Sequence, residues 1–178
     1  MRIISGKFRG KKLIKFNKEG IKPTTDKMRE SIFNIVISYL KVNEKNNNVP
    51  LKNFTVLDIF AGTGALGIEA ISRGAEKVTF IEKSRDNLNV LYKNIDLLKI
   101  SEKVKIIKRS IRKVKKINGE FDLIFMDPPY QMDLIIKKTL EKILDFKIIK
   151  KETIIVIEFA KKKQIVVPKN FEIIKKKD

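Results

Sequence analysis

The chain has 178 residues, of which 43% are hydrophobic, enough for one compact domain with an apolar core. It contains neither cysteine nor histidine, so disulfides, thiol catalysis, serine–histidine triads and zinc sites built from these two residues are excluded. No apolar run approaches the ~20 residues that span a bilayer, and the first residues lack a signal-peptide pattern. We therefore expect a cytoplasmic protein without a membrane anchor.

The formal net charge is +19, from 40 basic and 21 acidic residues, and the isoelectric point is about 10.0. Such a surplus of positive charge favours a polyanionic partner such as a nucleic acid. Of the 40 basic residues 33 are lysine, and isoleucine and asparagine are also abundant. Coding bias of an A/T-rich genome would produce the same pattern, so the charge alone leaves both interpretations open.

The first residues of the chain are predicted to form a basic β-hairpin over positions 1–13, with turns at Gly6 and Gly10. We assign residues 1–22 to an amino-terminal extension and residues 23–178 to the main domain.

A helix is predicted next, from the capping residues Thr24, Thr25 and Asp26 to about Lys41. Apolar side chains recur along this segment at helical spacing, which indicates that one face packs on a core. The polar, asparagine-rich stretch 43–50 that follows is predicted to be a connector.

From residue 54 onward, strand-like and helix-like segments alternate along the chain. The pattern predicts a mainly parallel, seven-stranded sheet covered by helices on both faces, hence an α/β fold. In such sheets ligands bind at the carboxyl ends of the strands. The predicted strands are 55–58, 77–82, 104–107, 121–127, 153–158 and a terminal antiparallel pair, 164–167 with 171–174; the predicted helices are 65–73, 85–98 and 132–144.

The stretch DIFAGTGALG, residues 58–67, contains a complete G-x-G-x-x-G motif after a predicted strand. Glu82 lies 20 residues after Gly62, where it could accept hydrogen bonds from the two hydroxyls of a ribose. Both NAD and S-adenosylmethionine carry such a ribose. Asp58 favours S-adenosylmethionine, because an anion there repels a pyrophosphate and attracts an ammonium and a sulfonium.

The stretch MDPPYQ closes the fourth predicted strand, at the same edge of the sheet. Pro128 and Pro129 have no N–H group, so this strand end presents only acceptors, the Asp127 carboxylate and the Pro128 carbonyl. These two acceptors match the two hydrogens of an exocyclic amine on a nucleobase, and Tyr130 could stack on the base. The motif therefore predicts transfer of a group to such an amine.

Four motifs spread over nearly the whole chain resemble those of known enzymes. The motifs D-x-F-A-G-x-G at 58–64 and DPPY at 127–130 are similar to class I S-adenosylmethionine-dependent methyltransferases that act on an exocyclic amine. The stretches RIISGKFRGKKL at 2–13 and KPTTDKMRESIFNIV at 22–36 resemble the RsmD family. Members of that family are bacterial enzymes that methylate a guanine N2 in 16S ribosomal RNA.

The resemblance implies a Rossmann-like class I methyltransferase fold with an amino-terminal β-hairpin extension. It also implies S-adenosylmethionine as methyl donor, no metal, and 16S ribosomal RNA in the assembled 30S particle as substrate; we expect a monomer. The segment after the third predicted strand has no carboxylate for the adenine amino group, so Ser110 or the backbone would serve instead. The predicted catalytic residues are Asp127, Pro128 and Tyr130, and the predicted cofactor-binding residues are Asp58, Phe60, Gly62, Gly64, Glu82 and Ser110.

The predicted RNA contacts are Arg2, Lys7, Phe8, Arg9 and Arg29. A basic hairpin with one aromatic residue suits phosphate contacts and one stacked base. The resemblance places the helix start near the substrate, hence Arg29. Capping, an ion pair and a hairpin docked on the domain with solvated lysines would explain the same residues without RNA.

Three alternatives to a guanine-N2 methyltransferase stay open from the sequence. An adenine-N6 methyltransferase of DNA or RNA uses the same acceptors, although asparagine is usual where Asp127 stands. An NAD(P)-dependent oxidoreductase would use the glycine motif and give Asp127 no role. A non-catalytic RNA-binding protein would bind RNA without turnover.

Overall fold

The computed structural model describes residues 1–15, 25–43, 49–128, 133–159 and 166–177. The elements of this part alternate between helix and strand, as the sequence predicts. In chain order they are α1 (Asp26–Asn43), β1 (Thr55–Ile59), α2 (Ala65–Ser72), β2 (Lys77–Ile81), α3 (Arg85–Leu98), the short 3₁₀ helix η1 (Ser101–Lys103), β3 (Val104–Ile107), a second one, η2 (Ile111–Lys113), β4 (Phe121–Met126), α4 (Asp133–Asp145) and β5 (Ile149–Ile157).

The five strands form one sheet in the order β3-β2-β1-β4-β5, and every neighbouring pair is parallel. Their apolar, largely β-branched sequences suit a sheet that is buried on both faces. From β1 the chain builds outward through β2 and β3, then returns to the other side of β1 to add β4 and β5. The direction of winding therefore changes between β1 and β4, and such a switch point is where open α/β sheets bind ligands.

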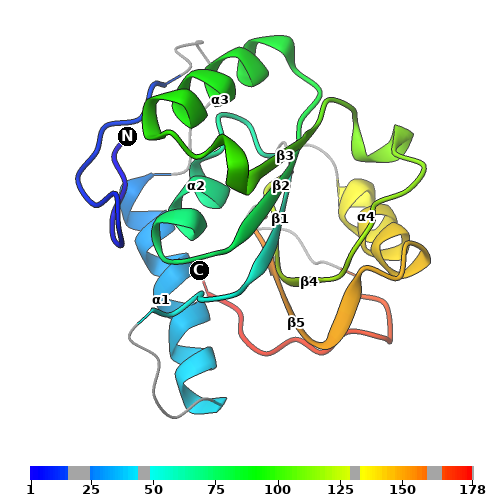
Figure 1. Cartoon of the computed structure of the whole chain (residues 1–178). Helices are drawn as coiled ribbons and strands as arrows, with labels where there is room; N and C mark the ends of the chain where they lie inside the picture. Colours follow the sequence, from blue (N-terminus) through cyan, green and yellow to red (C-terminus); the bar gives the residue numbers. More distant parts are fainter. Residues whose placement is uncertain (16–24, 44–48, 129–132, 160–165, 178) are drawn as a thin grey trace.

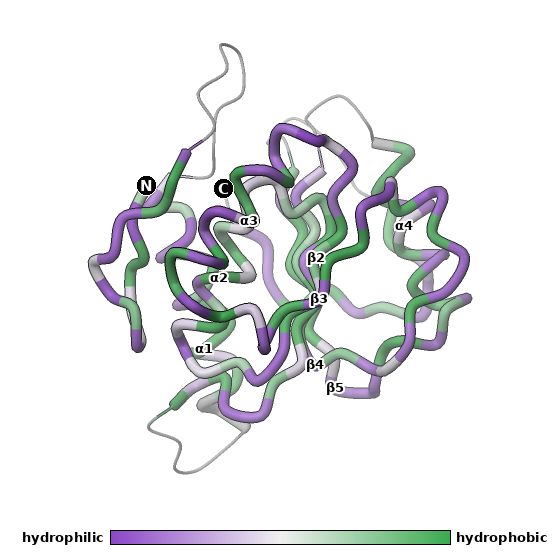
Figure 2. The backbone as a smooth tube through the Cα atoms, turned by 45° about the horizontal axis from the view of Figure 1, so that its top comes forward, coloured by the Kyte–Doolittle hydropathy of each residue, from purple (hydrophilic) through white to green (hydrophobic). Residues whose placement is uncertain are grey.

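Helices cover both faces of the sheet, as predicted (Figure 1). On one face α1, α2 and α3 contribute Phe33, Ile68 and Leu91 to a hydrophobic cluster with the strands. On the other face α4 and η2 pack a second cluster, which includes Ile111 and Leu140. Hydrophobic backbone segments run along the central strands, and hydrophilic ones lie on the outer turns (Figure 2). None of the helices in the described part is long and apolar enough to cross a membrane.

The amino-terminal extension is a short antiparallel hairpin, with one bridge between Arg2 and Lys12. Its side chains Ile3, Phe8 and Leu13 are buried in the same cluster as α1, α2 and α3. The hairpin thus shares the core of the main domain. The boundary predicted at residue 22 lies outside the described residues.

The described residues form five strands, so the predicted number of seven is not confirmed. Residues 171–174, expected in a terminal antiparallel pair, lie outside any strand, and positions 164–165 of the other half are outside the described residues. Ile173 and Ile174 are both about half exposed. Because these side chains are not buried, the apolar pattern of this segment is only a weak signal for a strand. Most of the predicted connector, 44–48, also lies outside the described residues.

Candidate active site

The strand register brings the candidate residues to one edge of the sheet. Ile59 of β1 pairs with Ile81 of β2 and with Met126 of β4. Ile81 pairs in turn with Ile107, and Met126 with Ile157. The residues that follow these five therefore form the next row across the carboxyl edge, in the order Lys108, Glu82, Phe60, Asp127 and Glu158.

Asp58 is a buried carboxylate just before the end of β1, with 1% of its surface exposed. Its Oδ2 accepts a hydrogen bond of 2.9 Å from the Gly67 N–H of α2. Burial raises the pKa of Asp58 to about 7, against a hydrogen bond that lowers it, and the charges of Asp127 and Glu82 add to the rise. A cation that bound here would restore the charged form, so the site favours a positively charged ligand group.

The turn after β1 keeps its ligand-facing side open. Phe60 has φ 66° and Gly62 has φ 56°, both in the left-handed region. This conformation is uncommon for a residue with a side chain and is found at functional turns. A Cβ built on Gly62 would meet no atom within 4 Å. The open side leaves space for a ligand against the backbone, so this turn fits the adenosine-bearing cofactor that the sequence predicts.

The other two glycines of the motif serve packing. Gly64 has φ 84° and caps α2, and a Cβ there would lie 2.4 Å from Leu91 Cδ1 of α3. At Gly67 a Cβ would lie 2.3 Å from Phe80 Cε1 of β2. These two positions let α2 approach the sheet and α3 closely. Gly64, predicted as a cofactor residue, shapes the turn that faces the cofactor site.

Glu82 joins the glycine turn to the start of α3. Its Oε2 accepts a hydrogen bond of 2.7 Å from Gly62 N–H, and its Oε1 accepts two more of 2.7 Å from Lys83 N–H and Ser84 N–H. An ionised carboxylate has about four acceptor sites, so three bonds leave capacity for one further donor. Its predicted contact with a ribose stays a prediction that this geometry permits.

Asp127 and Pro128 follow β4, beside β1 at the switch point of the sheet. Asp127 is partly buried and Pro128 is buried. The Asp127 charge contributes to the raised pKa of Asp58. Glu158 reaches the same edge, because its N–H donates a 2.9 Å hydrogen bond to Met126 O. Tyr130 lies outside the described residues, so its predicted role stays a prediction.

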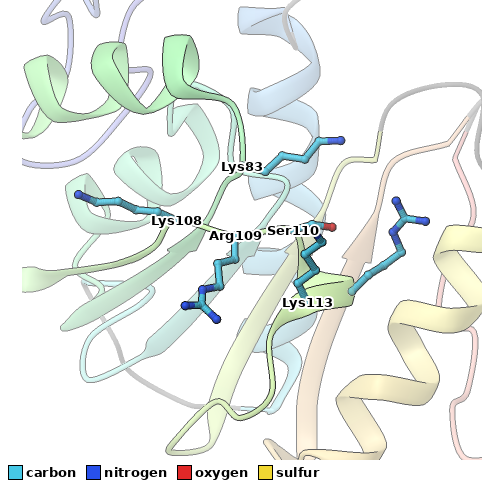
Figure 3. Close-up of a pocket in the computed structure, with 6 residues that line it drawn as sticks. Lys83, Lys108, Arg109, Ser110 and Lys113 are labelled. Carbon is cyan, nitrogen blue, oxygen red and sulfur yellow. The ribbon is translucent and has the colours of Figure 1, made fainter.

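Ser110 lies in the turn between β3 and η2 and lines a pocket of about 450 Å³. Its carbonyl oxygen accepts a hydrogen bond of 2.8 Å from Lys113 N–H. The remaining lining residues are all basic: Lys83, Lys108, Arg109, Arg112 and Lys113 (Figure 3). Ser110 was predicted as a site residue from the sequence, whereas its basic neighbours were not, although most of them stand close to it in the sequence.

Two predicted RNA contacts are wrong. Phe8 is 8% exposed and belongs to the hydrophobic core, so its ring is not presented to a base. The guanidinium of Arg29 is 1% exposed; it donates hydrogen bonds of 2.6 Å to Arg2 O and 2.9 Å to Asp26 Oδ1. Arg29 therefore fastens the hairpin to α1. Lys7 and Arg9 are exposed, and the Arg2 side chain is 71% exposed, so these three remain available to a ligand.

A group of buried polar residues that holds the hairpin was not foreseen. Glu69 of α2 accepts hydrogen bonds from Ile4 N–H at 2.8 Å and Ser5 N–H at 3.0 Å. It also forms an ion pair of 2.8 Å with Arg73. A Cβ on Gly6 would lie 1.8 Å from the Ser72 carbonyl oxygen, so only glycine fits where the hairpin meets α2. A glutamate within the otherwise apolar stretch ALGIEAIS was the available signal.

Asn94 of α3 connects the same hairpin to the glycine turn. This fully buried side chain accepts a hydrogen bond of 2.8 Å from Ile14 N–H. Its Nδ2 donates bonds of 3.2 Å to Ile14 O and to Thr63 O. One side chain therefore fixes both the chain just after the hairpin and the glycine turn.

Comparisons with known proteins agree with this architecture. The model of the family described as Conserved hypothetical protein 95 matches residues 1–178. Ribosomal RNA small subunit methyltransferase D of Buchnera aphidicola subsp. Acyrthosiphon pisum is 40% identical over 98% of this chain and 86% of its own length. The protein of the same name from Haemophilus influenzae is 35% identical, over 99% of this chain and 88% of its own.

The solved structure titled putative methyltransferase yhhF from Escherichia coli is similar in fold, with a TM-score of 0.78 and 30% identity. The similarity covers 97% of this chain and 88% of that one. The sheet, its glycine turn and this similarity define a Rossmann-like methyltransferase, which confirms the predicted fold and enzyme class. The chain belongs to the family described as Conserved hypothetical protein 95, and the predicted resemblance to RsmD enzymes is confirmed.

Proposed function

We propose that the protein transfers the methyl group of S-adenosylmethionine to the exocyclic N2 amine of a guanine in 16S ribosomal RNA, within the assembled 30S particle. One observation carries this proposal: Asp58 and Asp127 stand at the carboxyl ends of the paired strands β1 and β4, beside an open glycine turn. One carboxylate can serve a cationic cofactor while the other serves the substrate amine.

The cofactor side of the site consists of Asp58, the glycine turn and Glu82. The buried Asp58 carboxylate would attract the positive amino group of S-adenosylmethionine, and the free acceptor site of Glu82 would take a ribose hydroxyl. The open side of Gly62 would lie against the cofactor, with Phe60 beside it. When bound, the cofactor supplies an activated methyl group, so the chain needs no histidine for this chemistry.

The substrate side consists of Asp127 and Pro128, with Tyr130 as the proposed stacking partner of the base. The Asp127 carboxylate and the Pro128 carbonyl would accept the two N–H groups of the amine. These bonds orient the nitrogen lone pair toward the methyl group, and the Asp127 charge stabilises the positive charge that grows on nitrogen. After transfer the nitrogen must lose one proton, and Asp127 stands where it can accept it.

Ribosomal RNA as substrate is supported by the two relatives named ribosomal RNA small subunit methyltransferase D, whose lengths this chain covers by 86% and 88%. The surplus of 19 positive charges fits a polyanionic substrate. The exposed Arg2, Lys7 and Arg9 on the hairpin would contact phosphates. An adenine-N6 activity remains the alternative, because the two acceptors would serve either amine.

Methyl transfer with tritium-labelled S-adenosylmethionine tests the proposal. The acceptors are small subunits from cells that lack the gene, their naked 16S ribosomal RNA, and duplex DNA. We expect label in the small subunits and, after nuclease digestion, in N2-methylguanosine. Label in N6-methyladenosine would establish the alternative, and binding of NADH in preference to S-adenosylmethionine would overturn the cofactor assignment.

A further inference from the structure

The helix α2 could begin one residue earlier than it does. Such an extension would join the Gly67 N–H to the carbonyl of Thr63, four residues before it. In the structure the Gly67 N–H donates to Asp58 Oδ2 instead, at 2.9 Å. The regular pattern begins one position later, with the Ile68 N–H on Gly64 O at 2.9 Å. The Thr63 carbonyl therefore needs a donor from outside the helix.

Asn94 of α3 supplies that donor. Its Nδ2 donates to Thr63 O and to Ile14 O, both at 3.2 Å, and its Oδ1 accepts from the Ile14 N–H at 2.8 Å. The two bonds to Ile14 fix which end of the amide faces the turn, because a reversed amide would point its oxygen at two carbonyl oxygens. The side chain is fully buried, so water does not compete for these bonds.

The glycine turn is held from two sides by side chains. Toward β2, the Gly62 N–H donates to Glu82 Oε2 at 2.7 Å. Toward α3, the Thr63 carbonyl accepts from Asn94. Gly62 and Gly64, on either side of Thr63, have φ values of 56° and 84°, and glycine changes its backbone conformation easily. The form of the turn at Thr63 therefore depends on the bond from Asn94.

Asp58 needs the Gly67 N–H because the carboxylate is buried among like charges. Burial raises the pKa of Asp58 to about 7, and the charges of Asp127 after β4 and Glu82 after β2 add to the rise. The hydrogen bond from Gly67 lowers the pKa. Loss of this bond would raise the pKa further, so the ionised form that attracts a cation would require a higher pH.

We propose that Asn94 is a positioning residue of the cofactor site, an inference that rests on the proposed function. By bonding to Thr63 O, Asn94 leaves the Gly67 N–H to the Asp58 carboxylate. Without Asn94 the Gly67 N–H turns to Thr63 O, α2 lengthens by one residue, and Asp58 loses its donor. Because Ile14 orients the Asn94 amide, the amino-terminal extension serves the cofactor site in addition to its proposed RNA contacts.

Asn94→Leu tests this role, since leucine is similar in shape to asparagine and lacks its donors. Asn94→Ala, which removes the amide without adding bulk, is the second variant. Leu98→Ala is the matched control: Leu98 lies one turn further along α3 and is buried in the core, so its truncation destabilises the fold without removing a bond of Asn94. Thermal unfolding checks that the variants fold. Calorimetry measures S-adenosylmethionine binding at pH 6 and pH 8.

We expect the Asn94 variants to raise the pH at which the affinity falls by about one unit, the scale of one hydrogen bond to a carboxylate. Their affinity relative to the wild type is then about one half at pH 8 and about one tenth at pH 6. The relative affinity of Leu98→Ala is the same at both pH values. If the Asn94 variants behaved like this control, Asn94 would serve only the stability of the fold, and the inference would be overturned.

NMR of the cofactor-free protein gives a test that does not depend on the proposed function. In the wild type the signal of the Gly67 amide proton follows the ionisation of Asp58, with a midpoint near pH 7. In the Asn94 variants the Gly67 signal loses this titration, because its N–H bonds to Thr63. A wild-type signal that stays constant between about pH 5 and pH 9, or a titration that the variants keep unchanged, would contradict the inference. Failure of the wild type to bind S-adenosylmethionine would count only against the proposed function.

Discussion

At the scale of single residues, Asp58 shows how burial prepares a site for a cation. A carboxylate with 1% exposure keeps its proton up to a pH of about 7, because burial disfavours the charged form. A positively charged ligand group reverses that preference. We therefore expect binding of the proposed cofactor to be coupled to loss of this proton.

We predict that the affinity for S-adenosylmethionine falls as the pH falls through about 7. Protonation of Asp58 below this value removes the charge that attracts the amino group, so the affinity decreases about tenfold between pH 8 and pH 6. Calorimetry at several pH values measures this for the wild type and for Asp58→Asn. The amino group of the cofactor titrates identically with both proteins, so an equal pH dependence in the two would contradict the coupling.

Asp127 is predicted to act on the substrate and not on the cofactor. Asp127→Ala removes one acceptor and the charge that stabilises the growing positive charge, so single-turnover transfer falls by about 10²-fold or more. Asp127→Asn keeps one acceptor oxygen and is expected to lose less. The affinity for S-adenosylmethionine stays nearly unchanged in both variants. A wild-type rate in Asp127→Ala would exclude this role.

Phe8 and Arg29 were assigned to RNA for different reasons. Phe8 stands among basic neighbours, which favoured a surface role, and the family resemblance placed Arg29 near the substrate. The fold buries them instead, because the hairpin docks on α1 and α2 through contacts that join residues 64 and 65 positions apart, such as Phe8 with Ser72 and Ile4 with Glu69. Contacts of this range leave little trace in a single short motif, whereas the positions of Asp58 in β1 and Glu82 after β2 follow from the local pattern of each strand and its turn.

At the scale of elements, α2 connects the glycine turn to the amino-terminal hairpin. Its start carries the glycine turn, and its last turns hold the hairpin through Glu69 and Ser72. Arg73 pairs with Glu69 and places its guanidinium 4.6 Å from the centroid of the Phe33 ring of α1. The hairpin, α1 and the glycine turn are therefore positioned by one short helix.

Glu69→Ala is expected to lower the free energy of unfolding by about 3–5 kcal/mol, because it leaves the buried Arg73 charge and two hairpin N–H groups without their acceptor. Glu141→Ala is the matched control, since Glu141 pairs with Lys137 at the same helical spacing but both side chains are 50% exposed. The control should change stability by about 0.5 kcal/mol or less. Urea unfolding measures the stability of both variants, and equal losses would contradict this role of Glu69.

The helices and strands of the sheet were largely predictable, because each buried strand is a short β-branched run between turn residues. Strand β3 was predicted at 104–107, its observed bounds, whereas β5 begins at Ile149 and was predicted only from Thr153. Two exposed lysines and a glutamate, residues 150–152, interrupt the apolar pattern there. Residues 171–174 were predicted as a strand but form none. Here the apolar pattern is present, but the side chains Ile173 and Ile174 are not buried.

At the scale of the whole molecule, one edge of the sheet carries opposite charges side by side. Asp58, Glu82 and Asp127 bring negative charge to the centre, near the switch point between β1 and β4. Lys83, Lys108 and Arg109 flank them at the ends of β2 and β3, and the hairpin, which carries further exposed cations, is held on α2 and α1 through its backbone. This distribution suits the proposed cationic cofactor at the centre and a polyanionic substrate around it.

The central claim is guanine-N2 methylation of 16S ribosomal RNA, and mass mapping of that RNA tests it most directly. Small subunits are isolated from cells with the gene, without it, and with the gene carrying Asp127→Ala, and their RNA fragments are analysed for methylated guanines. We predict one N2-methylguanosine that is present with the wild-type gene and missing or strongly reduced in the other two strains. The same set of methylated guanines in all three strains would contradict the account.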